Sequence, residues 1–416
     1  MNVVARRHDF DVMIVGGGMV GACLAALLAA DQRLAPWRVA IVEPNPPRRP
    51  VDGTVDLRVS ALSRASQRIL IHAGAWPAIE GYACPYTDMV VWDAASRPDA
   101  RDALRFSAAE AGEPDLGCIV ENMRVQWALD ESPQLRAVTR LRAGLEALEF
   151  DEDSARVVLS DGRRFSCALV VGADGAQSRT RELCGISRAG WKYGQTAVVA
   201  HLRTERPHRS TAWQRFLPEG PLALLPLDAG RVSLVWTTSA AEAEELLALE
   251  ADAFSRSVTE SSGRVLGRLE LDSARAGLPL ALWHAREYVR PRLALAGDAA
   301  HTIHPLAGQG VNLGFLDCAS LVEVLGDAAE SGADPFGLRA LRRYERWRRS
   351  ENAVMLGATD TLNGLFRQKS VVAATARRLG LSVAAGQPLL RRALVRRALG
   401  LAGDLPALVT APGYAS

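Results

Sequence analysis

Cysteine is scarce in this chain of 416 residues, and its six cysteines form no Cys-x-x-Cys pair and no spacing typical of metal ligands. This scarcity argues against a disulfide-stapled scaffold, a zinc module or a dithiol redox centre, and no metal site is expected. The chain also lacks internal repeats, low-complexity linkers and any aromatic–basic module, so no nucleic-acid partner is expected. We interpret the cysteines as small buried side chains in a reducing compartment: Cys23, Cys84, Cys118, Cys167, Cys184 and Cys318.

Long hydrophobic runs are absent apart from one segment near the N-terminus. Val12–Ala30 contains no charged residue, and Arg6 and Arg7 before it imitate the start of a secretory signal. However, three consecutive glycines inside the segment suit neither a membrane span nor a signal helix, and a buried parallel strand also gives a continuous apolar run. The sequence therefore predicts a cytoplasmic protein.

This apolar segment contains a glycine motif typical of dinucleotide binding. Gly16, Gly18 and Gly21 follow a predicted strand and open a predicted helix with the spacing G-x-G-x-x-G, and Val20 lies inside the motif. The glycines permit a tight turn, close approach to a pyrophosphate and close helix–strand packing. A second strand, over residues 38–42, ends at Glu43, where a βαβ fold places the acid that binds a ribose. The segment therefore predicts a bound dinucleotide.

A second glycine-rich segment, residues 297–314, reads GDAAHTIHPLAGQGVNLG. Asp298 follows an apolar strand, Leu293–Ala296, and the glycines lead into a predicted helix, Val311–Leu325. A carboxylate at a strand end can accept hydrogen bonds from sugar-like hydroxyls, and the N-terminus of a helix can hold negative charge. The alternative is an ordinary strand–turn–helix connection whose glycines only relieve backbone strain.

A third segment, Ala168–Arg181, predicts a buried strand that ends at Asp174-Gly175. Upstream of it, residues 156–165 predict a hairpin that turns at Asp161-Gly162, because Asp-Gly favours two-residue turns. Two interpretations of Asp174 stay open at this point. It belongs to a turn, or, with the arginines that follow, it serves the phosphates of the dinucleotide from a second side.

The order of these three motifs resembles the class A flavoprotein monooxygenases, the aromatic-ring hydroxylases, and more closely the ubiquinone-biosynthesis hydroxylase family. A second dinucleotide fingerprint, as in disulfide reductases, and the WxWxIP motif of flavin-dependent halogenases are both absent. Met123 departs from the family pattern, in which Asn is often followed directly by Arg. The further matches span nearly the whole chain, at residues 56–66, 121–129, 212–227, 344–356 and 394–406.

The resemblance implies that FAD is the cofactor and NAD(P)H the co-substrate. Glu43 and the first glycine motif would hold the adenosine half of FAD, Asp298 the ribityl chain, and Gly308–Asn312 the pyrimidine edge of the flavin. Asp174 would lie near the pyrophosphate and the approach of NAD(P)H. For the arginines, an ordinary surface ion pair is the alternative. The expected cofactor-binding residues are Gly16, Gly18, Val20, Gly21, Glu43, Arg58, Arg124, Gln126, Asp174, Gly297, Asp298, Pro305, Gly308, Gly310, Val311 and Asn312.

The resemblance also implies hydroxylation of the aromatic ring of a polyprenyl-phenol intermediate of ubiquinone biosynthesis, through a C4a-hydroperoxyflavin. His304, next to Pro305, is the candidate base because an imidazole titrates in the useful range. A loop histidine that only orders the turn is the alternative, and His301 is the weaker candidate. Two other functions stay open: hydroxylation of a soluble aromatic compound, and a non-catalytic FAD-binding scaffold of a biosynthetic complex.

The family pattern predicts an α/β fold with a Rossmann-like, discontinuous FAD-binding domain. It would comprise residues 1–75, 112–186 and 284–355, and residues 356–416 would form a C-terminal helical region. Alternating apolar residues, as in Thr196–His201 and Val232–Thr237, predict a mainly antiparallel substrate sheet in residues 76–111 and 187–283.

Acidic residues are absent between Asp360 and Asp404, while eight basic residues lie there. The chain as a whole carries a net charge of only +2. A basic amphipathic end predicts peripheral contact with the inner face of a membrane, which suits a polyprenylated substrate, and a place in a ubiquinone-biosynthesis complex is a further possibility. The alternative is a C-terminal helix that packs its leucines on the body and leaves its arginines in water.

Overall fold

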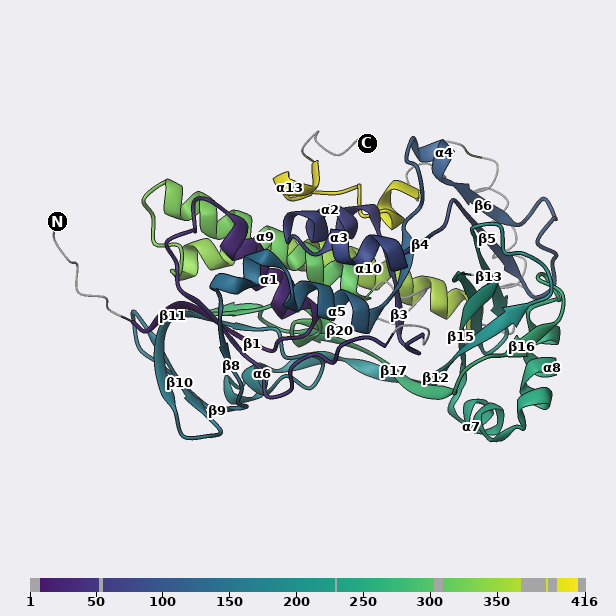
Figure 1. Ribbon diagram of the computed structural model, residues 1–416, viewed down its shortest axis with the longest axis horizontal. Coiled ribbons are helices and arrows are strands. Elements are labelled where there is room, and N and C mark those ends of the chain that lie inside the picture. Colours follow the sequence, from purple (N-terminus) through teal and green to yellow (C-terminus); the bar gives the residue numbers. More distant parts are fainter. Residues whose placement is uncertain are drawn as a thin grey trace.

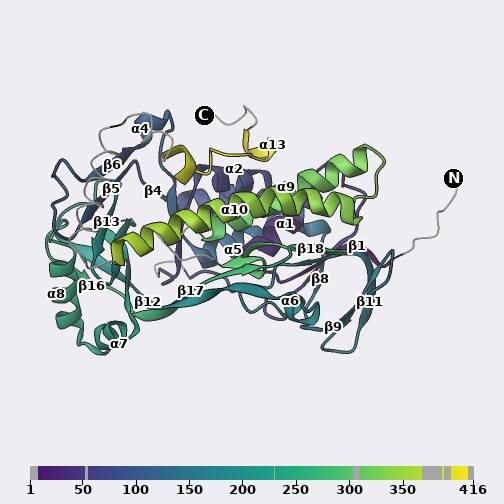
Figure 2. The same ribbon diagram turned by 180° about the vertical axis from the view of Figure 1, so that it is seen from behind.

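The computed structural model describes residues 8–51, 55–228, 230–302, 310–367, 387 and 395–410. Two parts lie at opposite ends of an elongated molecule, each built on a large sheet (Figure 1). Two long strands, β12 (Arg188–Thr204) and β17 (Ala276–Ala285), run from one part to the other. The helix α10 (Leu338–Arg367) also runs along the length of the molecule, above β12 and β17 in the view of Figure 2.

The first sheet is mainly parallel and has the order β18-β19-β11-β1-β2-β8. Strand β1 pairs in parallel with both β2 and β11, and β19 extends the parallel arrangement on β11. Its central strands are buried, which explains why they read as continuous apolar runs. The Rossmann-like prediction is confirmed. The strands are β1 (Phe10–Val15), β2 (Val39–Val42), β8 (Thr139–Leu141), β9 (Leu145–Phe150), β10 (Ala155–Leu159), β11 (Arg164–Gly172), β18 (Val289–Arg290) and β19 (Leu293–Leu295).

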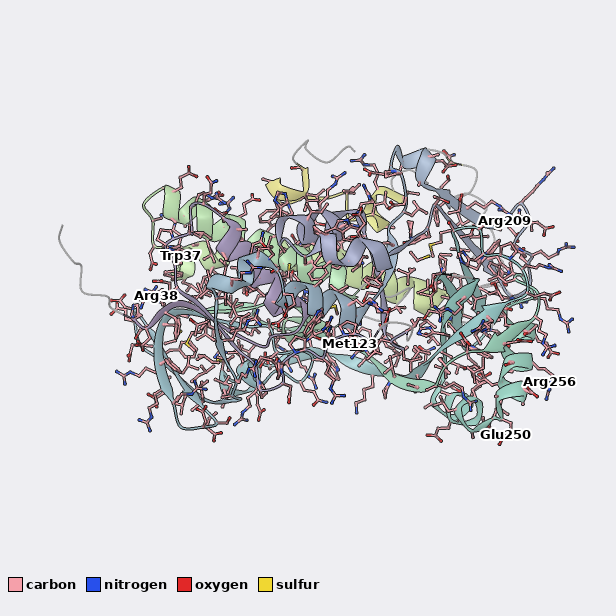
Figure 3. The ribbon with its side chains drawn as sticks, in the orientation of Figure 1. Trp37, Arg38, Met123, Arg209, Glu250 and Arg256 are labelled. Atoms are coloured by element: carbon pink, nitrogen blue, oxygen red, sulfur yellow. The ribbon has the colours of Figure 1, made fainter. Side chains whose placement is uncertain are left out.

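The second sheet has the order β20-β17-β12-β15-β14-β13-β5-β6, with β16 paired to β12. Its pairings are antiparallel except that of β5 with β13, so the predicted antiparallel character is confirmed. Figure 3 labels Arg209, Glu250 and Arg256 at this end of the molecule and Met123 near the middle. The remaining strands are β5 (Asp88–Asp93), β6 (Leu104–Ser107), β13 (Thr211–Leu217), β14 (Gly220–Pro226), β15 (Arg231–Ser239), β16 (Leu269–Leu271) and β20 (His301–Thr302).

A small third sheet lies between these two parts, with the order β3-β7-β4. Its strands are β3 (Val59–Leu62), β4 (Cys84–Pro85) and β7 (Cys118–Glu121). Strand β4 belongs to the segment 76–111, yet it pairs with β7 rather than with the large antiparallel sheet. The exact division of the chain into domains remains our proposal.

Helices cover the parallel sheet and connect it to the other elements. Helix α1 contacts α9 and α5, and α9 in turn contacts α2 and α10. The apolar segment Val12–Ala30 is divided between β1 and α1, and no helix in the described ranges has the length and apolar character needed to cross a bilayer. The helices are α1 (Met19–Ala30), α2 (Arg64–His72), α3 (Trp76–Ile79), α4 (Ala108–Ala111), α5 (Asn122–Asp130), α6 (Arg179–Leu183), α7 (Ala240–Ala248), α8 (Ala251–Ser261), α9 (Gly310–Glu330), α10 and α13 (Ala407–Thr410).

The described C-terminal segment, residues 395–410, packs on the body of the protein. Leu399 and Leu401 are buried, and the backbone N–H of Ala407 donates to Glu323 Oε2 at 2.7 Å. Arg397 pairs with Glu351, while Arg396 is exposed. In this segment the leucines therefore face the protein. Leu405 and Leu408 are half-buried and pack against the same core. Most of the basic residues of the C-terminal region lie outside the described residues.

Candidate cofactor cradle and active site

The three motif glycines have different physical reasons to be glycine. Gly16 has φ +102°, and a Cβ on it would lie 2.5 Å from Ala173 O. A Cβ on Gly21 would lie 1.9 Å from Gly16 O. A Cβ on Gly18, in contrast, would meet no atom of the described residues within 4 Å. The protein's own packing thus requires Gly16 and Gly21 but leaves Gly18 facing open space.

That open space lies at the N-terminus of α1. Gly18 is the N-cap residue, it has no side chain to accept the first N–H groups, and the first turn holds no acidic residue. The unpaired N–H groups and the helix dipole together favour an anion here. We call the turn at Gly16–Gly18 and the N-terminus of α1 the cofactor cradle. Its open space and its free N–H groups fit a dinucleotide pyrophosphate, and this evidence is independent of the motif spacing.

The carboxylate of Glu43 lies beside the same turn, as the sequence predicts for the ribose-binding acid. Its Oε2 accepts a hydrogen bond from Gly17 N at 2.8 Å, and its Oε1 accepts one from Asn45 N at 2.9 Å. Glu43, Gly17 and Ile41 line one pocket with Pro46. This arrangement suits the adenosine half of FAD. The sequence motif alone did not indicate the contact between Gly17 and Glu43.

Val20 lies between the two glycine-rich segments rather than in front of the cradle. A Cβ on Gly314 would lie 2.6 Å from Val20 Cγ2, and one on Gly297 would lie 3.0 Å from the same atom. Gly297 also has φ +60°. The side chain of Val20 thus packs between α1, α9 and the turn at Asp298. Its predicted contact with the cofactor stays a prediction.

Asp298 follows β19 and has a solvent-accessible side chain. Protein nevertheless surrounds the carboxyl group closely enough that burial raises its pKa above the ordinary value. The charges of His301 and Arg58 oppose this shift, and that of Asp317 adds to it. Asp298 is therefore an accessible carboxylate directly after β19, and a carboxylate there can accept hydrogen bonds from the hydroxyl groups of a ligand.

Arg124 does form an ion pair, but the pair is buried. Its Nε donates to Glu121 Oε1 at 2.7 Å, and its guanidinium carbon lies 3.7 Å from the ring centroid of Tyr82. Glu121 Oε2 also accepts from Asp56 N at 2.7 Å. Asp56 Oδ1 accepts from the backbone N–H of Arg58, whose own side chain is exposed. Glu121 thus links the segments that carry both arginines.

A cavity of about 410 Å³ adjoins Arg124, between the small third sheet and the end of the β14–β15 hairpin. Its volume falls within the usual range of ligand pockets. Its apolar walls include Val55, Ile119 and Leu227, and its charged groups include Arg231. Also on α5, Gln126 Nε2 donates to Gly17 O at 3.4 Å.

Asp174 is engaged in its own turn. Its carboxylate accepts hydrogen bonds from the N–H and hydroxyl of Thr180, both at 2.9 Å, and from the Ser178 hydroxyl. These contacts fix the start of α6. The backbone of Asp174 lies against the cradle, because a Cβ on Gly16 would be 2.8 Å from Asp174 Cα. The structure thus supports the turn interpretation of the side chain and leaves its phosphate role a prediction.

Asn312 is buried near the start of α9, and the polar atoms of its side chain are used within the protein. Its Nδ2 donates to Ala61 O at 2.9 Å, and its Oδ1 accepts from Ser63 N and Ser66 Oγ. A cofactor contact from Asn312 would therefore come from its backbone. Gly310 and Val311 begin the same helix and are half-buried. The predicted residues His304, Pro305 and Gly308 lie outside the described residues.

A buried polar cluster behind this turn was missed by the sequence analysis. His301 Nε2 donates to Asp317 Oδ2 at 2.6 Å, and Arg348 Nε donates to Asp317 Oδ1 at 2.8 Å. Burial alone would raise the pKa of Asp317, but the charges of His301 and Arg348 and their hydrogen bonds lower it to about 2. The sequence did hold one signal for this cluster. Asp317 lies on the same face of the predicted helix as Leu313 and Leu321, and an acid on a buried face needs partners.

These features define a class of protein: an FAD-binding flavoprotein in which a Rossmann-like sheet is joined to a mainly antiparallel sheet. The FAD binding domain family matches residues 9–356. The p-nitrophenol 4-monooxygenase PnpA of Pseudomonas putida has the same fold, with a TM-score of 0.73, 20% identity, and coverage of 94% of this chain and 98% of that one. Klebsiella pneumoniae HpxO, complexed with FAD and uric acid, gives a TM-score of 0.70 at 19% identity, covering 94% and 96%.

Relatives identify the family more closely. The ubiquinone hydroxylase UbiL of Rhodospirillum rubrum is 40% identical over 392 residues, covering 94% of this chain and 89% of the relative. The 3-demethoxyubiquinol 3-hydroxylase of Escherichia coli is 36% identical, covering 94% and 98%. Human mitochondrial ubiquinone biosynthesis monooxygenase COQ6 is 37% identical, covering 86% and 85%. The chain belongs to the family of ubiquinone-biosynthesis hydroxylases, and it is an FAD-dependent monooxygenase.

Proposed function

We propose that the chain hydroxylates the aromatic ring of a polyprenyl-phenol intermediate of ubiquinone biosynthesis, with NAD(P)H and O₂ as co-substrates. The main structural support is the pairing of β20 with β17, in which His301 lies opposite His284. Strand β20 begins three residues after Asp298, so the turn that would hold the ribityl chain is joined directly to the antiparallel sheet. A flavin held at this turn would lie next to that sheet, where a substrate pocket is expected.

The residues of the chain would bind and orient the cofactor. The N-terminus of α1 at Gly18 would hold the pyrophosphate, Glu43 the ribose, and Asp298 the ribityl hydroxyls. Arg58 and Arg124 would lie along the FAD, near the flavin and the phosphates. Bound FAD would accept a hydride and activate oxygen, and the protein would place the phenol ring and exclude water. His304 remains our candidate for the base that deprotonates the phenol.

A soluble aromatic substrate is the second candidate. It is favoured by the charged side chains that line the cavity of about 410 Å³, which include Glu121, Arg124, Asp228 and Arg231. A polyprenyl chain would instead use the apolar wall formed by Val55, Ile119 and Leu227.

Peripheral contact with the inner face of a membrane, and a place in a ubiquinone-biosynthesis complex, complete the proposal. The support is the charge pattern: no acidic residue and eight basic residues lie between Asp360 and Asp404. A polyprenylated substrate resides in the bilayer, and a basic surface near anionic lipid would bring the enzyme to it.

Oxygen incorporation tests the proposed reaction. Purified, FAD-loaded protein is incubated with NAD(P)H, ¹⁸O₂ and a polyprenyl phenol, and the product is analysed by mass spectrometry. We expect one ¹⁸O atom per product molecule and no product from a phenolic acid that lacks the prenyl chain. Turnover of the soluble phenol alone would establish the second candidate, and the absence of a hydroxylated product from the polyprenyl phenol would contradict the proposed reaction.

A further inference from the structure

The carboxylate of Asp317 is the centre of the buried cluster behind the Asp298 turn. Asp317 is wholly inaccessible to solvent, as a residue in the middle of α9. Its Oδ2 accepts from Gly297 N at 3.0 Å and from His301 Nε2 at 2.6 Å. Its Oδ1 accepts from Arg348 Nε at 2.8 Å and from Asn352 Nδ2 at 3.3 Å. A buried carboxylate is stable only with such partners, and all four donors come from other elements.

Two of these donors lie on either side of Asp298 in the chain. Gly297 precedes Asp298 directly, and His301 follows it by three residues. The same oxygen of Asp317 therefore holds the backbone before Asp298 and the side chain after it. The backbone N–H of Ala300 donates to Gly297 O at 2.8 Å and closes the turn. Asp317, on α9, thus sets the path of the backbone through the turn that carries Asp298.

The cluster also reaches the antiparallel sheet. His301 pairs with His284 of β17, and Tyr288 Oη lies 2.9 Å from His284 Nε2. Asn352 Nδ2 donates to Tyr288 Oη at 3.3 Å, besides its contact with Asp317. A closed path of hydrogen bonds and strand pairing thus joins Asp317 to β17 twice, through His301 and through Asn352.

We propose that Asp317 is a positioning residue: it sets the turn at Asp298 for the ribityl chain of FAD and fixes that turn to the substrate sheet. The proposal rests on the cofactor role of Asp298 proposed above. A purely structural ion pair would, when broken, destabilise the fold as a whole without a specific effect on cofactor affinity, because the cost is that of the uncompensated buried charge. A positioning residue affects cofactor affinity beyond its effect on the fold.

Asp317→Asn tests this distinction, because it removes the charge and keeps the shape. The amide can accept hydrogen bonds through one oxygen only, so it cannot hold Gly297, His301 and Arg348 together. We expect FAD affinity, measured by quenching of flavin fluorescence on titration of the apo-protein, to fall about tenfold or more. The rise in melting temperature on adding FAD should shrink, and the flavin absorption bands of the bound cofactor should shift.

Glu345→Gln is the matched control. Glu345 is buried on the same helix as Arg348, and its Oε1 accepts from Tyr288 N at 2.8 Å, but none of its hydrogen bonds within the described residues reaches the turn at 297–302. We expect it to destabilise the apo-protein comparably while leaving FAD affinity within about twofold. If Asp317→Asn does not fold, the double variant Asp317→Asn/Arg348→Met removes both charges together and serves in its place.

Equal FAD affinity in the Asp317 variant, whether single or double, and in Glu345→Gln would overturn the positioning role. This result is independent of the proposed reaction, because the titration uses FAD alone and no phenol. Failure of the polyprenyl phenol to react in wild-type protein that binds FAD normally would overturn the proposed function and leave the role of Asp317 intact.

Discussion

Gly18→Ala is expected to lower FAD affinity by about 100-fold and to leave the stability of the apo-protein nearly unchanged. A Cβ at this position meets no atom of the described residues within 4 Å, so the methyl group would occupy the space that we assign to the pyrophosphate. Charge-assisted hydrogen bonds contribute about 1.5–3 kcal/mol each, and about 1.4 kcal/mol corresponds to tenfold in affinity. Loss of one or two such bonds from the N–H groups of α1 gives the expected change.

The apo-protein should tolerate Gly18→Ala because two small effects oppose each other. Alanine is less favourable than glycine at an N-cap, but it reduces the conformational entropy of the unfolded chain where the backbone is extended, as at Gly18 with φ −68°. The net change should stay within about 1 kcal/mol, measured by denaturant unfolding.

Two other glycines serve as controls for this experiment. Gly357→Ala, in α10, also adds a Cβ that meets no described atom within 4 Å. Gly357 is far in sequence from the Gly16–Gly21 motif, so this variant should leave FAD affinity unchanged. Gly21→Ala should destabilise the apo-protein itself, because its Cβ would lie 1.9 Å from Gly16 O. Unchanged FAD affinity in Gly18→Ala would show that the pyrophosphate does not lie at α1.

Asp298→Asn is expected to weaken FAD binding by about tenfold at neutral pH and to remove a pH dependence that the wild type shows. An ionised carboxylate accepts hydrogen bonds from hydroxyl groups more strongly than a neutral amide. Burial raises the pKa of Asp298 in the free protein, so its protonated form persists to higher pH than for an ordinary aspartate. Wild-type affinity should therefore rise with pH through this pKa and become constant above it.

FAD titrations of the apo-protein from about pH 4 to about pH 7 measure both effects. Asp161→Asn is a suitable control, because Asp161 is an exposed acid in the β10–β11 hairpin turn. Its affinity and pH profile should match those of the wild type. If Asp298→Asn bound FAD as tightly as the wild type at every pH, Asp298 would not contact the ribityl chain.

Local patterns in the sequence predicted much of the parallel sheet. The strand–glycine–helix order of β1 and α1, the Asp-Gly hairpin, and the strand before Asp298 all depend on contacts between near neighbours or on backbone geometry. The pairing of β20 with β17 and that of β4 with β7 depend on distant segments. Hydrophobic periodicity carries no information about which of several short strands will pair.

In the candidate site, the hydrogen-bond partners of the side chains were harder to predict than the places of the residues in strands, turns and helices. Asp174 follows a buried strand and Asn312 lies in the first turn of α9, but the polar atoms of both side chains form hydrogen bonds within the protein. Arg124 forms the ion pair that we considered, yet as a buried pair with Glu121 rather than at the surface. Asp317 was missed because its partners lie on β20 and α10, and only the folded chain brings them together.

The quinone profile of a strain that lacks the gene tests the central claim most directly. We expect ubiquinone to fall and one polyprenyl phenol, lacking a ring hydroxyl, to accumulate, as detected by mass spectrometry. The wild-type gene should restore the profile, and the Gly18→Ala variant should restore it poorly, because it binds FAD more weakly. A normal ubiquinone profile in the deletion strain would contradict the proposed function.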